Sequence, residues 1–354
     1  MSNRKQTKIA PSAQTQTLMH KEGWQAPARI ALQVAANTGA IEALGARLRA
    51  SPPTLVVTCA RGSSDNAASY AKYLIETHIG TPTLSAAPSV NSVYNTHQDM
   101  SQVLFLAISQ SGKSPDILSA AHAAKAGGAL VVCLVNETHS PLARLADIVI
   151  PLHAGTELSV AATKTFICSL SAIVHLVAAW GQNATLLAGL KVLPGILEST
   201  LACDWSAALP VLVSANNLFV VGRGLGLGVA QEAALKFKET CSLHAEAFSA
   251  AEVKHGPMTL VKDGFPVLLF SAHDQTQPSI DDVASAFIAR GAKVLSAGHF
   301  YEGALALETA PCPVVELRPL VFIQSFYNFV NALSLARGQN PDQPPYLNKV
   351  TETL

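Results

Sequence analysis

The sequence is short of charged residues and carries no net charge. Lys, Arg, Asp and Glu make up 14% of the 354 residues, whereas about 25% is usual for a soluble protein. The 24 basic and 24 acidic side chains cancel, so no overall positive field would attract nucleic acid or an anionic membrane. Disorder of the whole chain is excluded because disorder needs low hydrophobicity, and apolar residues make up 49% here. So little charge predicts deep burial and a large subunit interface.

Membrane-spanning and secretory segments are lacking as well. The longest apolar stretch, 166–180, is interrupted by two serines and a histidine and is shorter than the roughly 20 residues that a spanning helix needs. The start of the chain is polar and basic, without the apolar core of a secretory signal. We expect residues 1–18 to form a disordered extension, and the protein to be cytoplasmic, with no membrane or nucleic-acid partner.

The sequence also lacks metal-binding patterns. Its six cysteines show no CxxC spacing, and Cys59 and Cys133 lie inside β-branched runs. This pattern predicts buried free thiols in a reducing compartment and argues against zinc. A metal site at His244, Glu246 and His255 would lack HExxH spacing, so we expect no metal.

Short apolar runs alternate with helical patterns along the chain. They lie at 54–59, 103–108, 129–135 and 147–151, and again at 218–221, 266–270, 293–297 and 313–317. Such alternation predicts an α/β fold with mostly parallel sheets flanked by helices. The second half repeats the first, since Gly62 matches Gly222 and Gly128 matches Gly291 at offsets of 160 and 163 residues. We therefore expect two copies of one domain, over 19–190 and 200–338, followed by a tail over 339–354.

A hydroxyl-rich loop follows the run at 103–108. It contains Ser109, Gln110, Ser111, Gly112 and Ser114, and a helical pattern begins at 116. Hydroxyls, a glycine and a helix N-terminus at the end of a parallel strand suit a phosphate monoester. An ordinary N-cap loop is the alternative. A Walker A motif is excluded because its first glycine would fall at Ala107.

A second glycine cluster, at 222–228, follows the run at 218–221. It does not fit GxGxxG, because Leu227 and Val229 break the spacing. We expect a tight turn from a strand to a helix there, without a dinucleotide.

The densest polar stretch runs from 232 to 255. On a helix, Glu232, Lys236 and Glu239 would share one face. A solvated ion-pair face is one interpretation, but the small apolar neighbours favour a buried site. The stretch ends in a turn that projects His255, and a glutamate with a histidine can supply the base and acid for proton transfer beside a carbonyl.

Taken together, these motifs resemble the sugar isomerase (SIS) domain family, in the tandem arrangement of the isomerase half of glucosamine-6-phosphate synthases. The resemblance runs from Met19 to the C-terminus and rests on six segments, 109–112, 160–164, 235–239, 244–248, 252–257 and 342–349. It implies two tandem SIS domains, each a flavodoxin-like three-layer sandwich.

The resemblance also implies a role for each matching residue. Glu239 matches the base that moves a proton between C1 and C2, and Lys236 and Glu232 match its companions. His255 matches a ring-opening histidine that enters a neighbouring subunit's site, and Lys349 matches a tail lysine that closes over the open-chain sugar. Further matches bind the phosphate (Ser64, Ser109, Gln110, Ser111 and Ser114) or the sugar (Val160 and Ala162). The expected assembly is a homodimer with shared active sites, and no cofactor is required.

Several departures from the synthases bear on the reaction. Residue 2 is Ser and about eighteen residues precede the match, so we expect no glutaminase domain and no ammonia from glutamine. Ala162 stands where serine is usual, and Lys113 stands where an acidic residue is usual. Residues 271–276 do not resemble a second phosphate loop, so we expect one phosphate site per chain.

These features predict a glucosamine-6-phosphate deaminase that forms fructose-6-phosphate and ammonia. Three alternatives stay open: an enzyme for galactosamine-6-phosphate, a deglycase for fructosamine-6-phosphate, and a non-catalytic sugar-phosphate sensor. A sensor need not retain Glu239, His255 and Lys349, and the segment before Met19 is too short for a helix-turn-helix.

Overall fold

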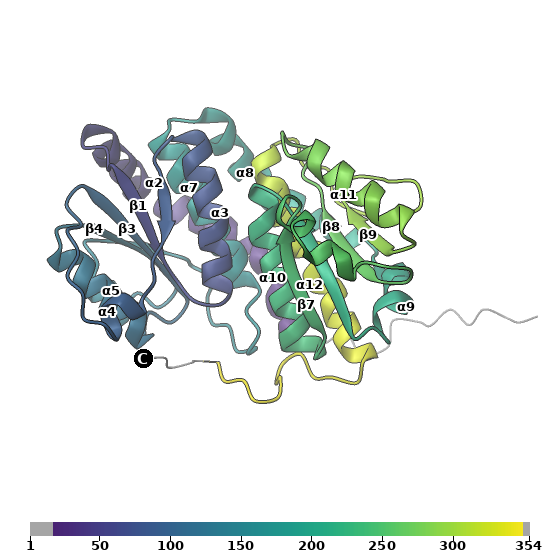
Figure 1. Ribbon diagram of the computed structural model, residues 1–354. Coiled ribbons are helices and arrows are strands. Elements are labelled where there is room, and N and C mark those ends of the chain that lie inside the picture. Colours follow the sequence, from purple (N-terminus) through teal and green to yellow (C-terminus); the bar gives the residue numbers. More distant parts are fainter. Residues whose placement is uncertain (1–16, 350–354) are drawn as a thin grey trace, which may run out of the picture.

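A computed structural model describes residues 17–349 of the chain (Figure 1). Residues 1–16 of the expected extension and 350–354 of the expected tail lie outside this range. Helix α1 begins at Leu18, and Thr17 caps it, so the first helix starts within the segment that was expected to be an extension.

The first half of the chain forms a five-stranded parallel sheet in the order β2-β1-β3-β4-β5. All seven residues of β3 are buried, as expected for a parallel strand covered on both faces. The strands are β1 (Leu55–Cys59), β2 (Thr83–Ser85), β3 (Val103–Ser109), β4 (Leu130–Val135) and β5 (Ile148–Pro151). The four strands predicted in this half are confirmed.

The second half forms an equivalent parallel sheet in the order β10-β9-β8-β6-β7. Its strands are β6 (Asn217–Gly222), β7 (His244–Ser249), β8 (Pro266–Phe270), β9 (Lys293–Ala297) and β10 (Leu305–Leu307). Matching β6 to β1 and β8 to β3 gives the same strand order in both sheets, which confirms the internal repeat. Gly62 and Gly224 cap the equivalent helices with φ of 56° and 57°, so Gly224 rather than Gly222 corresponds to Gly62.

The strand predicted at 313–317 is wrong. Val315–Leu317 is a short 3-10 helix, and the edge strand is β10. Pro311 and Pro313 lack the N–H groups that a sheet requires. Strands β2 and β7 were not predicted, because β2 has three residues and β7 carries polar side chains.

Helices cover both sheets and fill the space between them. They are α1 (Leu18–Gly23), α2 (Ala26–Ala50), α3 (Ser63–His78), α4 (Ser89–Ser92), α5 (Pro115–Ala126), α6 (Pro141–Leu145), α7 (Lys164–Trp180), α8 (Ala184–Ser199), α9 (Leu209–Leu212), α10 (Leu225–Cys241), α11 (Gln277–Ala289) and α12 (Arg318–Ala336). Figure 1 shows α3 and α10 side by side between the two sheets. A Cβ atom at Gly228 of α10 would lie 2.7 Å from the Asn66 carbonyl oxygen of α3, so the glycine permits this close packing. The segment at 222–228 is a strand-to-helix turn, as predicted.

One segment of the described chain, Ala184–Ala202, is long and apolar enough to cross a bilayer, with a mean hydropathy of 1.3. A single helix of this kind is weak support for a membrane span, since core helices meet the same criteria. Leu186, Leu190, Leu193 and Leu197 are buried in the main hydrophobic core. Helix α8 therefore packs as part of the globular fold.

Candidate active site

A cavity of about 330 Å³ lies at the carboxyl ends of β1 and β3, the edge at which parallel α/β sheets bind ligands. It is walled by the loops after these strands, the loop before α7, one face of α10 and the end of the described tail. Ten of the twelve predicted site residues line it, namely Ser64, Ser109, Gln110, Ser111, Ser114, Val160, Ala162, Lys236, Glu239 and Lys349.

Two helix N-termini form one end of the cavity. Helix α3 begins at Ser63 and α5 begins at Pro115, so their partial positive charges face the serine hydroxyls. The Ser109 hydroxyl accepts a hydrogen bond from the Gly112 N–H at 3.0 Å. Gly112 has a φ of 62°, and a Cβ atom there would lie 2.2 Å from the Ser140 hydroxyl. Only glycine fits this turn.

A buried charge cluster on α10 lines the cavity beside the N-terminus of α3. The Lys236 ammonium donates to the Ser63 hydroxyl at 3.1 Å, contacts the Glu239 carboxylate, and lies 3.4 Å from Glu232. The Lys236 and Glu232 side chains are 1% and 0% exposed. The solvated ion-pair face considered above is therefore wrong.

Glu232 is held by neutral donors in addition to Lys236. Its carboxylate accepts hydrogen bonds from Ser63 at 3.1 Å, Asn66 at 2.9 Å and Tyr327 at 3.0 Å. These partners come from α3 and α12, so the cluster joins the two halves of the chain. Glu232 does not line the cavity but lies behind Lys236 and fixes it.

Burial and charge act in opposite directions on this cluster. Burial raises the pKa of Glu232, and Glu239 adds to this rise against the opposing effect of Lys236. For Lys236, burial alone would lower the pKa, but Glu232 and Glu239 outweigh it and the pKa is raised. Lys236 is therefore protonated at neutral pH. Glu239 has a side chain that is 21% exposed and presents its carboxylate to the cavity.

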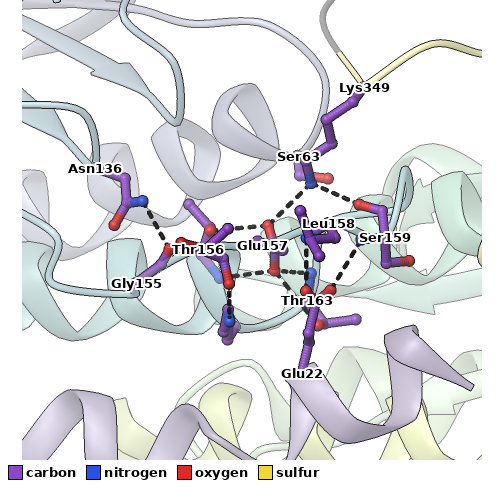
Figure 2. Close-up of polar contacts among 12 residues, drawn as sticks. Glu22, Ser63, Asn136, Gly155, Thr156, Glu157, Leu158, Ser159, Thr163 and Lys349 are labelled. Carbon is purple, nitrogen blue, oxygen red and sulfur yellow. Dashed lines mark hydrogen bonds and ion pairs between the residues drawn. The ribbon is translucent and has the colours of Figure 1, made fainter.

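The loop before α7 holds a further carboxylate, which is buried behind the cavity lining. Glu157 accepts the Thr163 N–H at 2.9 Å and the Thr165 hydroxyl at 2.8 Å. Figure 2 shows Lys349 reaching from the tail toward Glu157 and Ser159. Glu22 of α1 braces the same loop by accepting the N–H groups of Leu158 at 2.6 Å and Ser159 at 3.0 Å.

His255 is the other predicted residue outside the cavity. It is exposed on the turn after the 3-10 helix η4 (Glu252–Lys254) and does not line the cavity of its own chain.

Sequence reasoning missed three groups around this cavity. Ser63 adjoins the predicted Ser64, Glu157 lies in the loop with Val160, and Arg61 lines the cavity while pairing with Asp116 at 2.7 Å. Their closeness in the sequence to predicted site residues could have pointed to these groups. Within residues 17–349, no group of three or more His, Cys, Asp or Glu side chains could hold a metal ion.

All six cysteines are unpaired, as predicted, and none of them lines the cavity. Burial raises the pKa of both Cys59 and Cys133 to about 12, so neither thiol is poised as a nucleophile.

The SIS domain family matches residues 53–179 and 211–312. The chain belongs to this family. It is 35% identical over 300 residues to a glutamine–fructose-6-phosphate aminotransferase (isomerizing) of Methanothermobacter thermautotrophicus, an alignment that covers 81% of this chain and 50% of the relative. The chain thus spans about half the length of the curated relatives it matches.

Two solved structures share this tandem SIS fold. The C-terminal domain of the glucosamine–fructose-6-phosphate aminotransferase of Francisella tularensis superposes with a TM-score of 0.83 at 25% identity, covering 95% of this chain and all of that domain. A protein of Silicibacter pomeroyi, provisionally assigned as a phosphosugar isomerase, gives a TM-score of 0.88 at 42% identity, covering 92% of this chain and all of that one.

Proposed function

We propose that this SIS protein is a glucosamine-6-phosphate deaminase, which converts the amino sugar phosphate and water into fructose-6-phosphate and ammonia. The observation that carries the proposal is the Lys236–Glu239 pair, which faces a cavity that is also lined by two helix N-termini and five serines. The helix N-termini with their serines suit a phosphate, and the Lys236–Glu239 pair suits proton transfer beside a carbonyl.

The proposed reaction begins with the phosphate bound by Ser64, Ser109, Gln110, Ser111 and Ser114. After ring opening, Glu239 removes the proton from C2 while the C1 carbonyl oxygen takes a proton from water, which gives an enolamine. Return of the first proton from Glu239 to C1 gives a protonated imine at C2, and hydrolysis of this imine releases the second proton. Water adds to the imine carbon, the carbon–nitrogen bond breaks, and ammonia leaves a C2 ketone. Lys236, held protonated by its two carboxylates, would stabilise oxygen charge that develops during the transfer.

Ring opening is assigned to His255 of a second subunit. The exposure of His255 and its absence from its own cavity support a role across a subunit interface. The proposed assembly is a homodimer in which each active site takes residues from both chains.

The test is coupled detection of fructose-6-phosphate and ammonia from glucosamine-6-phosphate. Wild-type protein should release both in equal amounts, and Glu239→Gln should lower kcat by about 10²–10⁴-fold while phosphosugar binding survives. Galactosamine-6-phosphate, fructosamine-6-phosphate, and fructose-6-phosphate with glutamine serve as parallel substrates. Faster turnover of any of these would replace the assignment, and binding without turnover of any of them would make the protein a sensor.

A further inference from the structure

Side-chain hydrogen bonds attach the described tail to the body of the protein at two points. At the first, the Asp342 carboxylate accepts the backbone N–H groups of Leu18 and Met19, each at 2.8 Å, at the start of α1. At the second, the Lys349 ammonium donates to the Ser159 carbonyl at 2.6 Å and lies 3.3 Å from Glu157. Leu347, Asn348 and Lys349 line the cavity, so the tail between these points forms part of its wall.

Glu157 is fixed before the tail reaches it. Its side chain is 0% exposed. One carboxylate oxygen accepts the N–H groups of Thr163 and Thr165 at 2.9 and 3.3 Å, and the other accepts the Thr165 hydroxyl at 2.8 Å. These donors lie at the start of α7. They hold the carboxylate in the orientation in which one of its oxygens faces Lys349 (Figure 2).

A second lysine lies nearby but is engaged elsewhere. The Lys164 ammonium donates to the Gln25 side chain at 2.6 Å and to the Thr156 carbonyl. Lys349, by contrast, has a side chain that is 26% exposed and is hydrogen-bonded to the outer carboxylate oxygen of Glu157. The tail lysine therefore supplies a direct cationic partner for a carboxylate that is out of contact with water.

We infer that Glu157 is a positioning residue that docks the tail and fixes the Lys349 ammonium at the cavity wall, beside the sugar-facing residues of the same loop. Val160 and Ala162 lie three and five residues after Glu157 and line the cavity. Glu22 holds this loop from α1, the helix that Asp342 caps. Tail, helix α1 and sugar-facing loop are thus one hydrogen-bonded unit. The docking stands on the structure alone, whereas its effect on turnover rests on the proposed function.

The first test compares Glu157→Gln, Lys349→Met and the double variant. The amide keeps one acceptor oxygen for the loop but turns an NH₂ group toward the ammonium. We expect kcat to fall about 10–100-fold in each single variant, as for a misplaced reacting group, with a change in KM of less than about threefold. The double variant should lose no more than either single one. Additive losses would overturn the inference. Glu302→Gln, which changes an exposed carboxylate, is the matched control.

The second test needs no substrate. Trypsin cleavage after Lys349 releases the peptide 350–354, which mass spectrometry can follow in the intact protein. Glu157→Gln should release it at least about tenfold faster than wild type, as expected when a hydrogen bond to a charged group is lost, and so should Asp342→Asn. Release at the wild-type rate from Glu157→Gln would overturn the inference. If wild type turns over no amino sugar phosphate but Glu157→Gln still frees the tail, the proposed function fails and the docking role stands.

Glu157→Asp keeps the charge but shortens the side chain, so it separates docking from folding. We expect it to restore part of the protection against trypsin and part of kcat. If Glu157→Gln does not fold, Glu157→Asp provides the comparison, and faster release of the peptide with an unchanged melting temperature supports the inference.

Discussion

Lys236 shows how a charge can be buried beside a cavity. Its ammonium contacts Glu232, Glu239 and the Ser63 hydroxyl. Taking the charge out of water is unfavourable, and the two carboxylates offset this cost only while all three groups are present. Removing the lysine would leave Glu232 buried with neutral partners alone.

We predict that Lys236→Met lowers the free energy of unfolding by about 3–5 kcal/mol, because it leaves an uncompensated buried carboxylate. Adding Glu232→Gln should recover part of the loss. Urea unfolding followed by circular dichroism measures both. Lys72→Met, on the exposed side of α3, should stay within about 0.5 kcal/mol of wild type. Equal stability of Lys236→Met and wild type would mean that the cluster is not stabilised by this charge.

At this scale the sequence predicted residues whose partners lie close in the chain. The serine loop and the 232/236/239 face follow from local spacing, and both lie at the cavity. Ser63 and Glu157 were missed because their partners are distant: Glu232 is 169 residues from Ser63, and Lys349 is 192 residues from Glu157. A local sequence pattern cannot predict a contact between residues that lie so far apart in the chain.

Among the elements, α10 and α3 decide whether the site forms. Helix α10 belongs to the second half but presents Lys236 and Glu239 to a cavity at the edge of the first sheet. The approach of the two helices depends on Gly228, which faces Asn66 and Tyr70 without a side chain.

We predict that Gly228→Ala separates α10 from α3. The added methyl group would lie 2.7 Å from the Asn66 carbonyl oxygen and 3.0 Å from the Tyr70 nitrogen, which are backbone atoms that cannot rotate away. Stability should fall by about 1–3 kcal/mol, and kcat should fall more than KM changes. In the control Gly39→Ala, a new Cβ in α2 meets nothing within 4 Å and should stabilise the helix by up to about 1 kcal/mol. Unchanged activity and stability in Gly228→Ala would contradict this packing argument.

The element pattern was largely predictable because buried parallel strands are continuous apolar runs. Strand β7 escaped this rule, since it is an edge strand on which His244 and Glu246 are exposed. The strand predicted at 313–317 is wrong for a different reason. This segment is mostly apolar, but Pro311 and Pro313 keep it out of the sheet.

The groups that line the cavity come from different parts of the molecule. The first half and the tail supply the serines and much of the wall, the second half supplies Lys236 and Glu239, and His255 lies outside its own cavity. In a dimer with shared sites, variants that damage different components should therefore complement each other.

We predict that Glu239→Gln and His255→Asn, each inactive alone, regain activity when mixed. After random exchange of subunits, half of the dimers are mixed, and each mixed dimer holds one intact site of two. The expected recovery is about one quarter of wild-type activity for a twofold-symmetric dimer. The assay is ammonia release after denaturation and joint refolding, with Glu239→Gln refolded alone as the control. If no activity returns although mixed dimers form, His255 does not act across subunits.

The matched backbone of Gly62 and Gly224 at the starts of α3 and α10 marks these helices as counterparts in the two repeats, and they pack against each other. A protein with one repeat would have to associate with an identical copy to build this junction, and both sides would then need the same side chains. Covalent fusion removes that constraint. The two repeats can then carry different side chains, and in this cavity the serines come from the first repeat and the Lys236–Glu239 pair comes from the second.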